Sequence, residues 1–359
     1  MKAAICYEFG KPLVVEEIEV DPPRAGEVKV RLAATAICHS DIHHIRGDLG
    51  GALPEVAGHE SAGYVEEVGP GVTSVKPGDH VVISLLAACG ECLYCRTGRR
   101  HLCEFKWPIM QESRLRNKKG QRLVQMVRVG SFSEYTVVHQ SQVVAIPRDL
   151  RMDVACLLAC GVITGFGAVV NTAKLKAMSS AVIIGLGGVG LNAVQGAAFS
   201  GAHPIIAVDV LDSKLEAGKK FGATHTINAK QADPIKAVQG LTEGRGADYV
   251  FVTVGNVAAM RQGFLMSAPR GTTVIVGLPP GNADVSVPAF SFIRREQILT
   301  GSIMGSTNLA VDVPWLIGLY RSGRLKLDEL VTGRYPLERI NEAIESTETG
   351  QALRNVIVF

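Results

Sequence analysis

Residues 181–190 read AVIIGLGGVG, an apolar run that passes directly into a glycine turn of the form G-x-G-x-x-G. The run before the turn is strand-like, and the apolar segment after it is helix-like. In that context Gly185 permits a tight turn, Gly187 lets the backbone approach an anion, and Gly190 allows the helix to pack closely. Together with Gly188 and Val189, these residues predict a dinucleotide-binding turn in which a helix N-terminus faces a pyrophosphate. The alternative is a glycine-rich turn without a ligand.

The next strand-like run ends at Asp209, nineteen residues after Gly190. A carboxylate in that place is expected to accept hydrogen bonds from the adenosine ribose and to repel the extra phosphate of NADP. The sequence therefore favours NAD as the cofactor. Lys214 is close enough along the chain to keep NADP open as an alternative.

The pattern of predicted secondary structure changes near Pro147. Before it, short β-branched runs such as Val28–Leu32 and Glu134–His139 are separated by Gly and Pro, which predicts a small, irregular barrel. After it, strand-like runs alternate with helix-like segments, which predicts a parallel, doubly wound sheet. A chain of 359 residues is long for one core, so we expect an α/β protein of two domains. Asp284–Phe292 is a candidate edge strand of the second domain.

Composition and charge exclude several classes of function. A net charge of +3, with basic residues mostly scattered, is too small to indicate nucleic-acid binding, and the basic run Arg114–Arg122 is predicted to be a solvated loop. No signal peptide is recognisable, and no apolar stretch approaches the roughly 20 residues that a bilayer requires, so no membrane partner is expected. We expect a cytoplasmic protein, and in that reducing setting clustered cysteines are metal ligands rather than disulfides.

Four of the eight cysteines fall within fifteen positions. Two-residue gaps let consecutive sulfurs turn back onto one ion, and four thiolates make the closed tetrahedral shell of a structural zinc. The predicted ligands of this structural site are Cys89, Cys92, Cys95 and Cys103.

A second metal site is suggested by Cys38, His59 and Cys160, which no local spacing rule connects. Two thiolates and an imidazole would form a three-ligand zinc with an open fourth position, the pattern of a catalytic site. Taken singly, each residue is explained as well by a small buried cysteine or a histidine that makes an ordinary hydrogen bond.

Gly58-His59-Glu60, the four-cysteine run, the glycine turn and residues 160–165 (CGVITG) together resemble the zinc-dependent alcohol dehydrogenases of the medium-chain dehydrogenase/reductase superfamily, near the class I and class III branches. The resemblance covers essentially the whole chain. It implies a GroES-like β-barrel catalytic domain, residues 1–161 and 304–359, and a Rossmann domain that binds NAD, residues 162–303. It also implies two zinc ions per chain and a homodimer or homotetramer.

The resemblance also implies roles for individual residues. Cys38, His59 and Cys160 would hold the catalytic zinc, Glu60 would be an occasional alternative ligand, and Asp41 would accept a hydrogen bond from the zinc-bound imidazole. Ser40 would take the proton of the substrate alcohol and pass it outward to His43. The remaining cofactor contacts would be His39 and Arg354 at the pyrophosphate, Thr164 and Val189 at the nicotinamide, and Lys214 at the adenosine ribose.

The implied activity is reversible oxidation of a small-molecule alcohol, with hydride transfer to NAD. Leucines at positions 49, 85 and 278, which line the substrate cleft in the family, favour an apolar primary alcohol. One alternative is a class III-like dehydrogenase of S-hydroxymethyl thiols, the adducts of formaldehyde, because Arg114 falls near a position that contacts anionic substrates. A more distant alternative is a zinc-free relative such as a quinone reductase.

Overall fold

The computed structural model describes every residue, 1–359, and the chain forms two compact units. Unit 1 contains Met1–Cys160, Asn308–Ser322 and Leu327–Phe359. Unit 2 contains Gly161–Thr307 and Gly323–Lys326. The chain therefore passes from unit 1 to unit 2 for the first time directly after Cys160.

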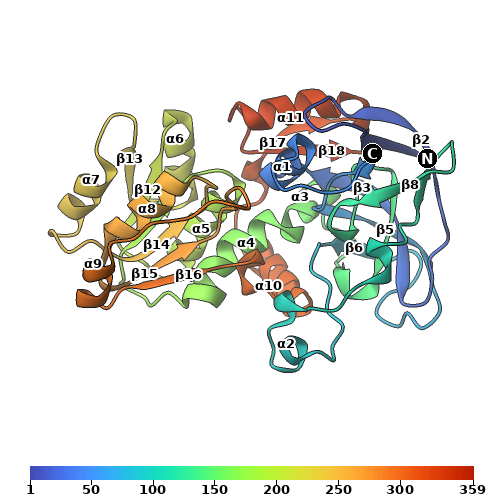
Figure 1. Cartoon of the computed structure of the whole chain (residues 1–359). Helices are drawn as coiled ribbons and strands as arrows, with labels where there is room; N and C mark the ends of the chain where they lie inside the picture. The colour runs from blue at the N-terminus through green and yellow to red at the C-terminus, as the bar shows by residue number, and fades with distance from the viewer. The chain divides into compact units, whose positions relative to one another are not determined.

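Unit 1 contains a small closed barrel with the strand order β1-β2-β7-β8-β4. Two of its strands, β2 and β8, are labelled in Figure 1. Its interior is filled by a buried apolar cluster that includes Ile5, Ile18, Val56, Leu115 and Leu123. Every strand of the barrel contributes at least one residue to this cluster, as expected where side chains fill a small barrel. The strands are β1 (Lys2–Cys6), β2 (Val14–Val20), β4 (Glu55–Val56), β7 (Leu115–Asn117) and β8 (Arg122–Gln125).

A second sheet of unit 1 has the order β10-β6-β5-β3-β18-β17, with β9 also paired to β3. The last strand, β18, runs antiparallel to β3 and brings the end of the chain beside residues 34–36. The Ile37 N–H, just past β3, donates to the Asn355 carbonyl over 2.9 Å. The strands are β3 (Glu27–Ala36), β5 (Ser61–Val68), β6 (His80–Ile83), β9 (Tyr135–His139), β10 (Val143–Ala145), β17 (Val331–Tyr335) and β18 (Arg354–Val358).

Helices in unit 1 are mostly short and join these strands. The first begins directly after β3, with Cys38 as its N-cap residue, so the end of a central strand fixes the start of the helix. The helices are α1 (His39–Arg46), α2 (Leu93–Arg96), α3 (Met152–Ala155), α10 (Leu309–Arg321) and α11 (Ile340–Glu348).

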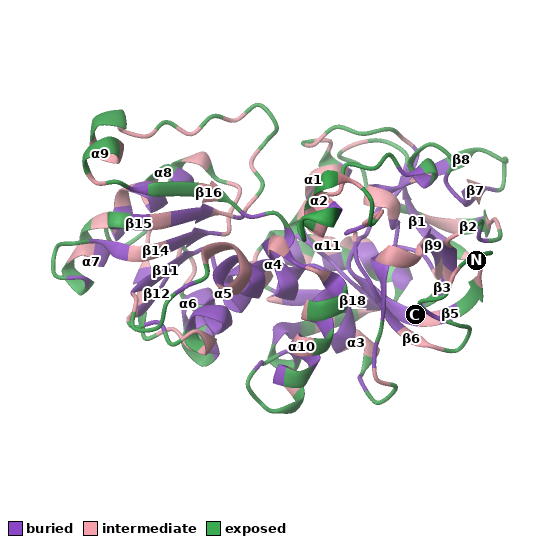
Figure 2. Cartoon of the chain, turned by 90° about the horizontal axis from the view of Figure 1, so that it is seen from below, coloured by how far each residue is buried: buried purple, intermediate pink, exposed green.

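Unit 2 contains a six-stranded sheet of order β13-β12-β11-β14-β15-β16, parallel throughout. Counted from β11, this is the order 3-2-1-4-5-6 of doubly wound sheets, which bind dinucleotides where the strand order reverses. Central strands such as β11 and β14 are largely buried (Figure 2), because helices flank a parallel sheet. The expected fold class is therefore confirmed.

The sheet of unit 2 contains β11 (Ala181–Ile184), β12 (Ile205–Asp209), β13 (His225–Asn228), β14 (Ala247–Val252), β15 (Ser267–Ile275) and β16 (Ile298–Gly301). Its helices are α4 (Gly161–Gly167), α5 (Gly188–Phe199), α6 (Asp212–Phe221), α7 (Pro234–Leu241), α8 (Val257–Met266) and α9 (Ala289–Arg294).

The predicted edge strand at Asp284–Phe292 is wrong. Residues 284–288 form no strand, and α9 occupies the second half of the segment. Pro288 has no N–H to donate to a ladder and instead serves as the N-cap of α9. The edge strands of the sheet are β13, which pairs only with β12, and β16, which pairs only with β15.

The predicted solvated loop at Arg114–Arg122 is confirmed only at its centre, where residues 118–121 form an exposed turn, and is wrong at its two ends. β7 and β8 form an antiparallel hairpin in which Leu115 pairs with Leu123. Both leucines are fully buried, and so is Arg114. The basic residues hid this hairpin because they alternate with apolar residues that face the barrel core.

No single helix is long and apolar enough to cross a bilayer. One bent pair of adjoining segments, Met152–Ala159 and Gly161–Ala173, reaches the necessary length and hydropathy together. Most of its residues are buried within the fold, as in the core helices of many proteins.

Candidate active site

Cys38, His59, Glu60 and Cys160 form one compact group in unit 1. All four are buried, and their ligand atoms lie within 4.8 Å of one another. Cys38 stands between β3 and α1, His59 and Glu60 lie directly before β5, and Cys160 follows the short helix Cys156–Ala159. The Ala36 N–H donates to the Glu60 carbonyl over 2.8 Å and so ties the end of β3 to the His59-Glu60 segment.

One carboxylate, that of Asp41, holds two of these residues. Its Oδ2 accepts the backbone N–H of Cys38 over 2.8 Å, and its Oδ1 lies 2.7 Å from Nδ1 of His59. A carboxylate only accepts, so Nδ1 carries the proton and the lone pair of Nε2 is left for a metal. The predicted hydrogen bond between Asp41 and His59 is therefore present, and α1 is the element that supplies it.

The electrostatics of the group suit metal binding. Burial alone lowers the pKa of His59, but the charge and hydrogen bond of Asp41, together with Cys38, raise it well above its ordinary value. The hydrogen bond from Cys160, with His59 nearby, lowers the pKa of the Cys38 thiol well below its ordinary range despite burial. The site therefore favours a thiolate beside a basic imidazole.

The spacing of the donors also fits zinc. His59 Nε2 lies 3.3 Å from the Cys160 sulfur. Tetrahedral zinc with its usual bond lengths separates such a nitrogen and sulfur by about 3.5 Å. Two thiolates, one imidazole and an alternative carboxylate form the donor set of a catalytic zinc with an open position.

Glu60 is paired with Arg354 behind this group. The Arg354 guanidinium donates to the Glu60 carboxylate, and both side chains are buried. One further donor of Arg354, Nε, is buried without a hydrogen-bond partner. β3 pairs with β18 on one side and with β5, which follows Glu60, on the other, and so brings these two residues together across 294 positions of sequence.

The expected relay residues lie on α1. The Ser40 hydroxyl is 3.8 Å from the Cys38 sulfur. His43 is one turn further along the helix, partly exposed, and its Nδ1 lies 2.7 Å from a carboxylate oxygen of Asp48. His39, the first residue of the helix, is exposed. The helical spacing of three residues places Ser40 and His43 on one face.

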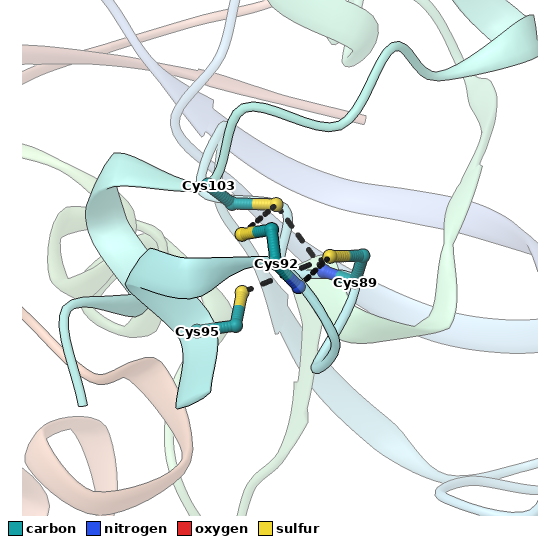
Figure 3. Close-up of side chains that lie close together, drawn as sticks. All are labelled: Cys89, Cys92, Cys95 and Cys103. Atoms are coloured by element: carbon teal, nitrogen blue, oxygen red, sulfur yellow. Dashed lines mark hydrogen bonds between the residues drawn. The ribbon is translucent and has the colours of Figure 1, made fainter. Parts of the chain in front are cut away.

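The four-cysteine lobe forms a second cluster, around α2 (Figure 3). Cys89 and Cys95 sulfurs lie 3.9 Å apart, and those of Cys92 and Cys103 lie 4.0 Å apart. Tetrahedral zinc–thiolate geometry requires about 3.8 Å, whereas a disulfide requires about 2 Å. The lobe therefore fits a tetrathiolate zinc.

Backbone N–H groups donate hydrogen bonds to the cysteine sulfurs of this lobe. Cys92 N–H donates to the Cys89 sulfur over 3.3 Å, as does Cys89 N–H to the Cys103 sulfur. Hydrogen bonds from the backbone of Cys95 and Glu104 lower the pKa of Cys92 to about 6. Such donors stabilise thiolates, the form that binds zinc.

The glycine turn in unit 2 has the expected construction. Gly185 has φ of +88°, and a Cβ at Gly190 would lie 1.8 Å from the Gly185 carbonyl, so both positions require glycine. A Cβ at Gly187 would meet no atom within 4 Å, which leaves open space at the N-terminus of α5. Gly188 and Val189 form the first turn of that helix.

Asp209 closes the turn from the end of β12. Its Oδ2 accepts the Leu186 N–H over 2.7 Å, and its Oδ1 accepts the Val210 N–H over 2.7 Å. Lys214 is buried in α6, where burial lowers its pKa against the charge of Asp209. Thr164, in α4, is buried, and its hydroxyl lies 3.6 Å from the Met304 sulfur.

Comparison with known proteins fits both units. Residues 24–148 match the alcohol dehydrogenase GroES-like domain, and residues 188–319 match the zinc-binding dehydrogenase domain. The chain is 40% identical to the NDMA-dependent alcohol dehydrogenase of Amycolatopsis methanolica, over 99% of this chain and 98% of that protein. This chain belongs to the zinc-dependent alcohol dehydrogenases.

Two further alcohol dehydrogenases are similar to this chain, one in sequence and one in structure. Class-3 alcohol dehydrogenase of Pisum sativum is 40% identical over 99% of this chain and 97% of that protein. The crystal structure of benzyl alcohol dehydrogenase from Acinetobacter calcoaceticus superposes with a TM-score of 0.93 at 30% identity, covering 100% of this chain and 99% of that one.

Arg114 is not available to a substrate in this dehydrogenase. Its Nε and one terminal nitrogen donate to the two carboxylate oxygens of Glu27 over 2.8 and 2.6 Å, and the guanidinium is buried. The expectation that Arg114 contacts an anionic substrate is therefore wrong. The remaining terminal nitrogen of Arg114 donates to the Glu112 carbonyl, so all three guanidinium nitrogens have partners within the fold, which the sequence spacing did not reveal.

Sequence reasoning missed some residues that position the site. The buried Ser84 donates its hydroxyl to the carbonyl of Ala159 over 2.6 Å and so fixes the residue before Cys160. Glu55, on β4, is buried 3.9 Å from His44 of α1. Neither has a local motif. No strand was predicted at Glu55, so the sequence offered no signal for its role.

Proposed function

We propose that this alcohol dehydrogenase reversibly oxidises an apolar primary alcohol to the aldehyde and transfers the hydride to NAD. The observation that carries the proposal is the buried set of Cys38, His59 and Cys160, with the Ser40 hydroxyl 3.8 Å from the Cys38 sulfur. That arrangement supplies a metal site with a hydroxyl beside it. Metal-assisted proton removal from an alcohol needs both.

Held by Cys38, His59 and Cys160, zinc would act as a Lewis acid on the alcohol oxygen, and bound NAD would serve as the hydride acceptor. The chain's own residues move the proton. Ser40 accepts it from the alcohol as it gives its own hydroxyl proton outward, and His43 receives the proton at the end of this relay. Asp41 keeps His59 in the tautomer that a metal requires.

The preference for NAD is supported by the end of β12. Asp209 places a carboxylate beside the glycine turn, and its two oxygens already accept backbone N–H groups. A carboxylate held this firmly repels a 2′-phosphate and retains acceptor capacity for ribose hydroxyls. We propose Thr164 and Val189 as nicotinamide contacts, Lys214 as a ribose contact, and His39 and Arg354 as pyrophosphate contacts.

A class III-like activity on S-hydroxymethyl thiols is the alternative that the comparisons support, through the pea relative. The burial of Arg114 against Glu27 weakens it, because the expected anion-binding residue is occupied. The name of the Acinetobacter relative supports aromatic alcohols within the main proposal.

Metal analysis and a substrate panel test the proposal together. We expect about two zinc ions per chain and turnover of benzyl and medium-chain primary alcohols, with NAD preferred over NADP. The panel is run with and without NDMA, because the Amycolatopsis relative is named for dependence on it. Faster turnover of S-hydroxymethyl thiols than of any free alcohol would establish the alternative. A protein with zinc only in the cysteine lobe and no alcohol turnover would refute both.

We further propose a cytoplasmic homodimer or homotetramer. The cysteines support a reducing compartment, since the lobe needs four of the eight as thiolates. The edge strand β16 supports self-association, because its outer side is unpaired and Ile298 is 51% exposed.

A further inference from the structure

Helix α1 carries a histidine–carboxylate pair at each end. At its start, Asp41 holds His59. At its end, Asp48 lies 2.7 Å from Nδ1 of His43. The roles described above explain the first pair and leave the second unexplained.

The local backbone builds the second pair. Gly47 ends α1 with φ of +85°, a conformation that glycine adopts without strain. The chain then reverses, and the Asp48 N–H donates to the His43 carbonyl over 2.9 Å. A Cβ at Gly47 would lie 2.9 Å from the ring of Phe9, so packing also requires glycine here. Asp48 is therefore folded back over the last turn of the helix.

This contact determines which nitrogen of His43 carries a proton. A carboxylate only accepts hydrogen bonds, so Nδ1 donates to Asp48 and Nε2 keeps a lone pair. Other titratable groups nearby are His44 and Asp41 on the same helix, and the Arg46–Glu348 ion pair joins α1 to α11. His43 and Asp48 are 36% and 41% exposed, and ion pairs so exposed contribute little to folding stability.

We propose that Asp48 is a positioning residue for the proton relay, which holds His43 as the Nδ1–H tautomer so that Nε2 is the proton acceptor. The inference rests on the proposed function. As Ser40 takes the proton of the alcohol it releases its own hydroxyl proton, and Nε2 of His43 gains a proton at the end of this relay while Nδ1–H remains hydrogen-bonded to Asp48. The resulting imidazolium then gives a proton to water, and the electron pair of the broken C–H bond leaves with the hydride to NAD.

Kinetics of the zinc-loaded enzyme test the inference with Asp48→Asn, Asp48→Glu and the control Glu348→Gln. The amide that Asp48→Asn introduces can present its nitrogen to the ring and favour the wrong tautomer. We expect kcat for alcohol oxidation to fall about tenfold at pH 6–7, with the loss shrinking toward pH 9 as hydroxide takes the proton directly. The KM for alcohol should stay within about twofold, because substrate binding is not the step affected.

The controls separate tautomer control from helix stability. Asp48→Glu, which keeps the carboxylate, should recover much of the lost kcat. Glu348→Gln breaks the other ion pair at this end of α1 and should follow the wild-type pH profile. An Asp48→Asn profile that superimposes on the wild type, or an equal loss in Glu348→Gln, overturns the inference.

Nitrogen-15 NMR of histidine-labelled protein gives a second readout without turnover, with His43 assigned by its loss in a His43→Gln variant. We expect the Nδ1–H tautomer in the wild type and a mixture in Asp48→Asn. Absence of alcohol turnover in the wild type would refute the proposed function and leave this measurement valid. Normal turnover with His43 in the Nε2–H form would refute the inference alone.

Discussion

The role of a single residue in this dehydrogenase depends on the contacts that its side chain makes in the fold. Asp41 is one carboxylate, yet it fixes the backbone of Cys38 and the ring of His59 at once. Arg114 does less than its type indicates, because its charge is neutralised by a buried ion pair with Glu27. In both cases the partner is decided by the tertiary structure, because the contacts span 18 and 87 positions of sequence.

Glu55 gives a prediction at this scale, because burial and the charge of Asp41 raise its pKa to about 7. An unfolded glutamate titrates near a pKa of about 4.3, so the unfolded chain loses this proton first. The contribution of Glu55 to the free energy of unfolding is therefore complete below about pH 4 and declines until the pH passes about 7. Glu55→Gln, which stays neutral, should gain stability relative to the wild type more at pH 8 than at pH 5.

Urea unfolding of the zinc-loaded protein at the two pH values measures this difference, with each variant compared to the wild type at the same pH. The exposed Glu338→Gln serves as the control, since Glu338 lies on the surface beside Lys2. Equal shifts for Glu55→Gln at pH 5 and pH 8 would contradict the assigned pKa.

Among the elements, the cysteine lobe is a self-contained structural piece. Its four sulfurs and the backbone N–H groups that point at them come from residues 89–104, so local sequence builds the site. By contrast, the predicted catalytic ligands come from three separate elements and depend on the whole of unit 1. Removing a ligand from the lobe should therefore have a different effect on stability and on turnover than removing a ligand from the catalytic group.

Cys103→Ser tests this difference. We expect the variant to lose one of two zinc ions per chain and to unfold at a lower temperature, because structural zinc contributes directly to folding free energy. The molecules that remain folded should keep most of their kcat. Zinc content by mass spectrometry, the melting temperature and kcat per folded chain are measured together. Intact stability with lost turnover would show that the catalytic metal lies in the lobe.

For the molecule as a whole, the open edge of the unit 2 sheet is the feature that a second copy would cover. β16 has an unpaired side, and nearby apolar side chains are exposed, including Phe290 at 78% and Ile293 at 77%. Ile298→Lys should weaken self-association at this edge without unfolding the chain, since charges on an edge strand oppose strand pairing.

Sedimentation velocity over a range of protein concentrations measures that effect. Val311→Lys, at an exposed apolar position of α10, is the matched control and should leave the oligomer intact. A wild-type protein that sediments as a monomer, or an Ile298→Lys variant that remains fully associated, would exclude β16 as the interface.

The features of this protein that could be predicted from the sequence alone are those set by residues close to one another along the chain. The glycine turn, the alternation of strands and helices in unit 2 and the four-cysteine lobe each follow from short-range patterns, because backbone conformation and close ligand spacing are local properties. The sequence also predicted Cys38, His59 and Cys160, but only through resemblance, since no spacing rule joins residues so far apart. The bond between Asp41 and His59 was likewise predicted only through resemblance. The partners of Arg114, Ser84 and Glu55, and a sheet edge at β16 rather than at 284–292, emerged from the folded chain alone. Those outcomes depend on strand register and packing, which bring together side chains whose separation in sequence carries no signal.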